Sequence, residues 1–127
     1  LFFSPDTTLE REPLLYFDHM YNVQCARVGR FKLHISRHDL VTMFGPSFRQ
    51  IINLPLKPPE LYDLKLDPRE CYDVSDRHPD VVTTIQERVA QLVEGMPRAV
   101  QRAYAETQAR RTLPQEQGRR VLRTASN

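Results

Sequence analysis

The feature that most constrains this fold is an apolar stripe on a helix that begins after His78. His78-Pro79-Asp80 is typical of a helix start, because Pro suits the first helical position and an acidic side chain suits the first turn. Beyond it, apolar residues recur at helical spacing and form one stripe: Val82, Ile85, Val89, Leu92 and Met96. Such a stripe is buried in a folded protein, so we expect the rest of the chain to supply a sheet for it to cover.

Four segments have strand character. Residues 14–17 form an apolar and aromatic run, and after a proline-rich stretch residues 60–66 resume strand character through Leu61, Tyr62, Leu64 and Leu66. Residues 23–28 and 31–36 are separated by Gly29-Arg30. Gly at the first of two loop positions supplies a positive φ angle, so these two segments are predicted to pair as an antiparallel hairpin.

The remaining segments contain breaks and turn signals. Between Arg37 and Pro59 the periodicity fades, and we expect a long connection with a helical turn around residues 48–52. Asp67-Pro68-Arg69-Glu70 has the pattern of a capping box, which predicts a tight helical turn after the fourth strand. Pro97 separates the first helix from a shorter one with a weaker apolar face: Ala99, Val100, Ala103, Tyr104 and Thr107.

Strands followed by helices predict an α+β fold, here a small four-stranded antiparallel sheet with a C-terminal helix packed on one face. The chain has 127 residues, enough for about one domain. We divide it into a lead-in segment (residues 1–12), the α+β domain (13–111) and a flexible Arg-rich tail (112–127). Because Leu1 is not Met, we expect the sequence to begin inside a longer polypeptide.

The charge is unevenly distributed. The net charge is +2, but the segment from Pro97 onward carries seven Arg and only two Glu. It lacks interleaved aromatic residues and any nucleic-acid module, so a solvated basic end is favoured and no nucleic-acid partner is expected. No apolar run is long enough to predict a membrane span. Homo-oligomerisation through the C-terminal helices remains open.

Cationic side chains gather on the predicted hairpin. Lys32 and His34 lie two residues apart on one strand and share a face, and Arg27 is expected close to Lys32 across the hairpin. The favoured interpretation is a solvated face with ion pairs to Asp18, Asp63 or Asp67. The alternative is an anion-binding face, or one that borders a substrate cleft, formed by the following residues: Arg27, Lys32, His34, Arg37 and His38.

A complete catalytic site is not recognisable. Asp18-His19 and His38-Asp39 are interpreted as turn residues, because catalysis needs groups that converge with a third one. Cys25 and Cys71 are interpreted as buried free thiols, and neither has a His beside it in the sequence, which argues against a thiolate nucleophile.

Four pieces of sequence nevertheless resemble sulfatases of the arylsulfatase type. Residues 25–34 resemble the hairpin AVR-x-G-x-YK-x-H, and residues 59–70 resemble the strand and turn P-x-LYDL-x-x-DP-x-E. Residues 72–74 correspond to the x-NL that follows, and residues 78–81 to the hPev opening of the terminal helix. Their order and spacing agree, so the resemblance covers most of residues 13–111. Cys25 and Asp73 depart from the pattern, which more often has an aliphatic or small residue and Asn.

The resemblance implies a C-terminal, non-catalytic portion of an enzyme that hydrolyses aryl or carbohydrate sulfates. It also implies a catalytic domain of the same polypeptide as partner, with a formylglycine made in a C/S-x-P-x-R motif and a calcium ion. Neither Cys25 nor Cys71 lies in such a motif, so we assign no catalytic, metal or cofactor residue to this segment. A periplasmic, secreted or lysosomal location follows from the resemblance alone. The alternative is an independent interaction or oligomerisation module that uses the basic C-terminal helical end.

Overall fold

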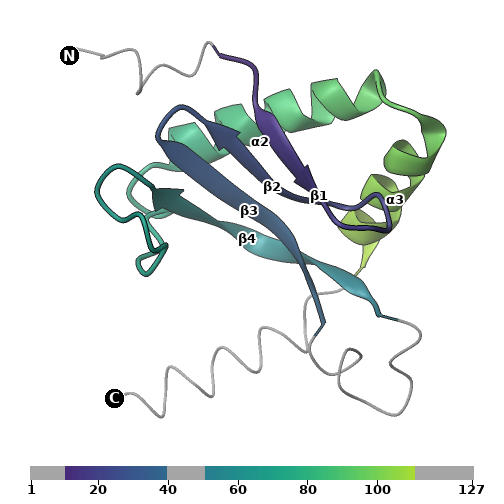
Figure 1. Ribbon diagram of the computed structural model, residues 1–127, viewed down its shortest axis with the longest axis horizontal. Helices are drawn as coiled ribbons and strands as arrows, with labels where there is room; N and C mark the ends of the chain where they lie inside the picture. The colour runs from purple at the N-terminus through teal and green to yellow at the C-terminus, as the bar shows by residue number, and fades with distance from the viewer. Residues whose placement is uncertain (1–10, 40–50, 111–127) are drawn as a thin grey trace.

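The computed structural model describes residues 11–39 and 51–110, which form one antiparallel sheet with helices on one side (Figure 1). The strands β1 to β4 lie in the sheet in chain order. This is the α+β fold expected from the sequence. The elements have these bounds: β1 Leu14–Phe17, β2 Val23–Val28, β3 Phe31–His38, β4 Asn53–Asp63, α2 Pro79–Glu94 and α3 Arg98–Ala109.

The β2–β3 hairpin forms where it was predicted. Gly29 adopts a φ angle of 59°, which is unfavourable for residues with a Cβ atom but readily adopted by glycine. The turn pairs Arg27 with Lys32 and Cys25 with His34 across the two strands. Because side chains alternate along a strand, Leu33 faces the helices while its neighbours Lys32 and His34 face away from them.

Helix α2 covers the sheet, as its apolar stripe predicted, but it is rotated slightly from the expected orientation. The buried ridge runs through Val81, Ile85, Val89 and Val93. Val82, with Met96 just beyond the helix, is only partly buried against the same core. The sequence offers apolar residues at both 81 and 82, and contact with the sheet selects the row with a strict four-residue spacing, which is inclined by about 26° to the helix axis.

Strand β4 begins earlier and ends earlier than the predicted 60–66, so part of the expected connection is strand. Pro55 pairs with Ser36, and the pairing with β3 shifts between His34 and Ser36. Proline is tolerated here because β4 is an edge strand, whose outward N–H groups need no partner in the sheet. The proline-rich composition had therefore indicated a loop where an edge strand forms.

A buried polar network fixes the end of α3 to the sheet. The shift in pairing places Ser36 among buried groups, where its hydroxyl donates to the Val23 carbonyl oxygen at 2.7 Å. The Asn53 side-chain amide donates to Ser36 Oγ and to Thr107 Oγ1 at 2.9 and 3.2 Å, and Thr107 in turn donates to Asn22. Buried polar groups satisfied in this way specify how an element packs, and this network holds α3 against β4.

The segment after β4 is a turn without the predicted capping box. Asp67 accepts hydrogen bonds from the backbone N–H groups of Cys71 and Tyr72, both at 2.9 Å, and Glu70 adopts a φ angle of 56°. A residue with a positive φ does not continue a right-handed helix. The side chain of Glu70 does not return to Asp67 but extends over the sheet.

Several predictions lie outside the described residues. They concern most of the lead-in segment, the tail at 112–127 and most of the helical turn around 48–52. Within residues 11–39 and 51–110, no helix has both the length and the apolarity to cross a membrane.

Candidate functional site

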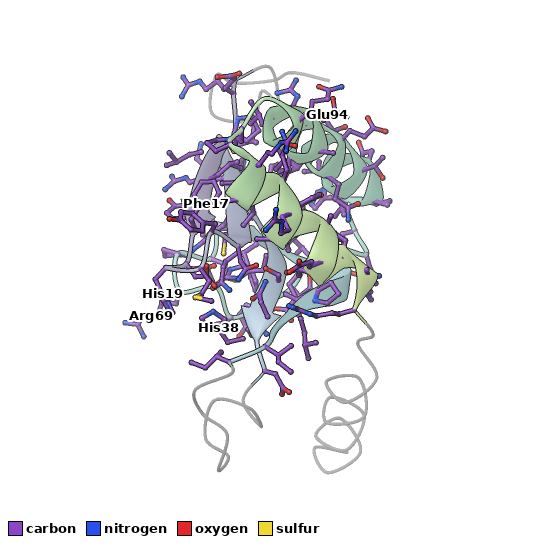
Figure 2. All side chains as sticks on the ribbon, turned by 90° about the vertical axis from the view of Figure 1, so that its right-hand side faces the viewer. Phe17, His19, His38, Arg69 and Glu94 are labelled. Atoms are coloured by element: carbon purple, nitrogen blue, oxygen red, sulfur yellow. The ribbon has the colours of Figure 1, made fainter. Side chains whose placement is uncertain are left out.

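The sheet face that points away from α2 carries a group of polar side chains around Glu70. We call it the outer-face cluster, and it consists of Cys25, Lys32, His34, Tyr62 and Glu70. In Figure 2, Arg69, next to Glu70, lies on the same side of the molecule as Phe17 and His19, whereas Glu94 at the end of α2 lies on the helical side. The turn after β4 thus approaches the open face of the sheet.

Glu70 connects the two cationic side chains of β3. Its Oε1 atom lies 2.5 Å from His34 Nε2, and its Oε2 atom lies 3.2 Å from Lys32 Nζ. Burial opposes ionisation of this carboxyl, but the hydrogen bonds from His34 and Lys32 outweigh that effect, and the pKa of Glu70 is lowered. Glu70 is therefore an ionised acceptor at neutral pH.

Tyr62 and Glu60 extend the site along β4. The Tyr62 ring meets the His34 ring edge-on, with centroids 5.2 Å apart, and its hydroxyl donates to Glu60 at 2.8 Å. Arg37 donates to the same carboxylate, also at 2.8 Å. Burial and the neighbouring Glu60 both raise the pKa of Tyr62, so this hydroxyl remains protonated and acts as a donor.

His38 belongs to a different part of the molecule. Its Nε2 atom lies 2.8 Å from Asp18, a turn residue that also accepts hydrogen bonds from Asn22. Burial would raise the pKa of Asp18, but bonds from Asn22 and His38 outweigh burial and lower it. The expectation that Asp18 is a turn residue is confirmed, whereas His38 is the last residue of β3 and not part of a turn. The pair is one of the ion pairs that the sequence analysis expected for the cationic residues.

The five candidate cations therefore separate into groups. Lys32 and His34 meet at Glu70, and Arg37 adjoins them through Glu60 and Tyr62. Arg27 is exposed, and its Nε donates to the Gly29 carbonyl oxygen at 3.2 Å. Of the three predicted partners, Asp18 pairs with a candidate cation, His38. Asp63 instead forms a two-bond salt bridge with Arg30, with a shortest distance of 2.5 Å, and Asp67 accepts backbone N–H groups of its own turn.

The expectation that both cysteines are buried free thiols is confirmed for Cys25 and wrong for Cys71. Cys71 is exposed rather than buried. Cys25 is buried, as expected, but its Sγ atom lies 3.3 Å from His34 Nδ1, although no His neighbours it in the sequence. The signal was present in the hairpin itself, because a turn at Gly29-Arg30 brings residues 25 and 34 directly opposite each other.

The outer-face cluster contains a thiol, an imidazole and a carboxylate in contact, together with a cation. Glu70 forms an ion pair with Lys32 and a hydrogen bond with His34, so an anion that contacts either side chain directly competes with Glu70. In the described part of the chain, no group of three or more His, Cys, Asp or Glu side chains is arranged to hold a metal ion. The sequence matches neither a known family model nor a curated protein.

Proposed function

We propose that this chain is the C-terminal, non-catalytic portion of a sulfatase that hydrolyses aryl or carbohydrate sulfate esters. In this proposal the domain packs against a catalytic domain of the same polypeptide and borders its substrate cleft. The formylglycine nucleophile and the calcium ion belong to that catalytic domain, and no described residue of this chain is assigned to either.

The observation that carries the proposal is that the sulfatase-like pieces of sequence contact one another. Lys32 and His34, in the hairpin piece, bind Glu70, in the strand-and-turn piece. Asp73, in the third piece, accepts a hydrogen bond from the backbone N–H of Leu61 at 3.0 Å. Residues that form such contacts hold a domain together. The sulfatase-like pattern is therefore explained by tertiary structure and does not require catalytic residues in this segment.

The fourth piece joins the same framework. The rings of His78, just before α2, and Phe31, at the start of β3, have centroids 5.4 Å apart. The helix that covers the sheet is thereby anchored at its first turn to the hairpin. A pattern spread over four separate segments thus corresponds to one set of tertiary contacts.

The test is sulfatase activity on a chromogenic aryl sulfate. We expect this chain alone to be inactive, and a longer polypeptide with an upstream C/S-x-P-x-R segment to be active. In the longer polypeptide, replacing the Cys or Ser of that motif by Ala should abolish hydrolysis, while Glu70→Gln should leave hydrolysis measurable but shorten its half-life on heating. Hydrolysis by residues 1–127 alone would contradict the proposal.

The alternative, an interaction module that uses the basic helical end, has weaker support. Arg98 and Arg102 are exposed on α3, but Arg110 is engaged with the Asn53 carbonyl oxygen at 2.8 Å. Binding to a polyanion that weakens steeply with added salt would favour this alternative. A monomer that is indifferent to polyanions would count against it.

A further inference from the structure

On the outer face of the sheet, the His34 side chain contacts Cys25 on one side and Glu70 on the other. Cys25 Sγ lies 3.3 Å from His34 Nδ1, and His34 Nε2 lies 2.5 Å from Glu70 Oε1. The three groups come from β2, β3 and the turn after β4, so only the folded chain assembles them. This order of nucleophile, base and orienting group is the one that activates thiols and hydroxyls in many unrelated proteins.

The proton positions follow from the carboxylate. Glu70 is ionised and can only accept hydrogen bonds, so the proton of the contact with His34 resides on Nε2. In a neutral imidazole the other nitrogen then carries a lone pair. In this neutral tautomer, Nδ1 of His34 faces the Cys25 sulfur at 3.3 Å with its lone pair and is positioned as the base for the thiol proton.

The resting form of Cys25 is the thiol. Burial raises the pKa of Cys25 and outweighs the attraction of the nearby cations. A buried thiol is ordinarily inert, but an adjacent base can remove its proton as it attacks an electrophile. Four charged groups act on this thiol through space: Lys32, Glu70, Arg37 and Glu60.

We propose that Cys25 is a modification site for small anionic disulfides, with His34 as its general base and Glu70 as the residue that orients His34. The Cys25 sulfur attacks one sulfur of the disulfide while its proton passes to His34 Nδ1. The disulfide bond breaks, a mixed disulfide forms on Cys25, and the departing thiolate takes the proton from His34. The small disulfide is the oxidant, and one of its halves leaves as a free thiol.

The cations beside the thiol determine the preferred reagent. Arg27 lies two residues from Cys25 on β2 and is paired with Lys32 across the hairpin. On the other side, Tyr16 of the edge strand β1 is paired with Cys25, and Lys32 Nζ lies 5.2 Å from the centre of its ring. A disulfide that carries carboxylates meets positive charge here, and glutathione disulfide is a probe of this class.

The experiment treats the folded protein with glutathione disulfide and follows each cysteine by peptide mass analysis. Cys71 is an internal control, because it is exposed and its sulfur contacts the Arg69 carbonyl oxygen rather than an imidazole. We expect His34→Gln to slow modification of Cys25 about 100-fold, as loss of a general base does, and to leave the rate at Cys71 unchanged. Lys32→Gln should slow the reaction with glutathione disulfide but not with neutral 2-hydroxyethyl disulfide.

A measurement on the unsubstituted protein protects the test against misfolded variants. A thiol without a base reacts in proportion to its thiolate fraction, which falls about tenfold per pH unit below its pKa. Base-assisted attack at Cys25 lacks this dependence, so the ratio of the Cys25 rate to the Cys71 rate should rise as the pH is lowered from 9 to 7. A constant ratio, or modification of Cys25 only after unfolding in urea, would overturn the proposal.

Discussion

At the scale of single residues, carboxylates that accept several hydrogen bonds hold this structure together. Asp63 receives both bonds of the Arg30 guanidinium and also the backbone N–H of Lys65. Burial disfavours its charge, but the interaction with Arg30 outweighs burial and lowers the pKa of Asp63. The salt bridge fixes the hairpin turn to the end of β4, so it joins segments that are far apart in the sequence.

Replacing Asp63 by Asn should reduce the free energy of unfolding at pH 7 by about 1.5–3 kcal/mol, the usual value of hydrogen bonds to charged groups. Because the folded state lowers the pKa of Asp63, its contribution is present at neutral pH and is lost as the pH falls through the folded pKa. The stability difference between the two proteins should therefore shrink below about pH 4. Urea unfolding at several pH values measures this stability difference between the Asp63→Asn variant and the unsubstituted protein. The control is Asp76→Asn, at an exposed carboxylate. A difference that is constant with pH would contradict this account.

At the scale of elements, local sequence patterns were sufficient to predict the β2–β3 hairpin and α2. They were not sufficient to predict where β4 begins or which side chains meet on the outer face of the sheet. Gly29 fixes a turn through its own backbone, and Pro79 starts a helix without help from distant residues. The start of β4 depends instead on pairing with β3, where an edge position tolerates Pro55. For the same reason the contact of Cys25 with His34 and Glu70 could not be read from neighbours in the sequence: it needs the strand register and the turn after β4.

The buried ridge of α2 gives the strongest prediction at this scale. Val89 has no exposed surface, so Val89→Asp places a charge without a partner beneath the sheet and should cost several kcal/mol, enough to unfold the domain. Ala90→Asp, one residue further on the exposed face, should cost less than about 1 kcal/mol. Circular dichroism during heating separates the two variants. Equal melting temperatures would show that the ridge is wrongly placed.

At the scale of the whole molecule, apolar side chains remain uncovered where β1 leads into β2. Leu14, Phe17, Met20 and Tyr21 are all between 43% and 59% exposed. Tyr21 also adopts a φ angle of 67°, which costs a residue with a side chain about 1–2 kcal/mol. An aromatic residue in a strained, exposed position is the basis for a hypothesis that it meets a requirement outside this fold. Packing against the proposed catalytic domain supplies one.

Tyr21→Gly tests this idea, because folding and docking should respond in opposite directions. Glycine adopts the same φ angle without strain, so the variant chain should melt at an equal or higher temperature, with a gain of up to about 1 kcal/mol after glycine's own entropy is included. In the longer polypeptide with its catalytic domain, the same substitution removes an aromatic contact and should shorten the half-life of sulfatase activity on heating. Thr83→Gly, on the exposed face of α2, should instead destabilise the isolated chain slightly, by about 0.3–0.5 kcal/mol. If Tyr21→Gly stabilises the isolated chain and the longer polypeptide alike, Tyr21 does not contribute to docking.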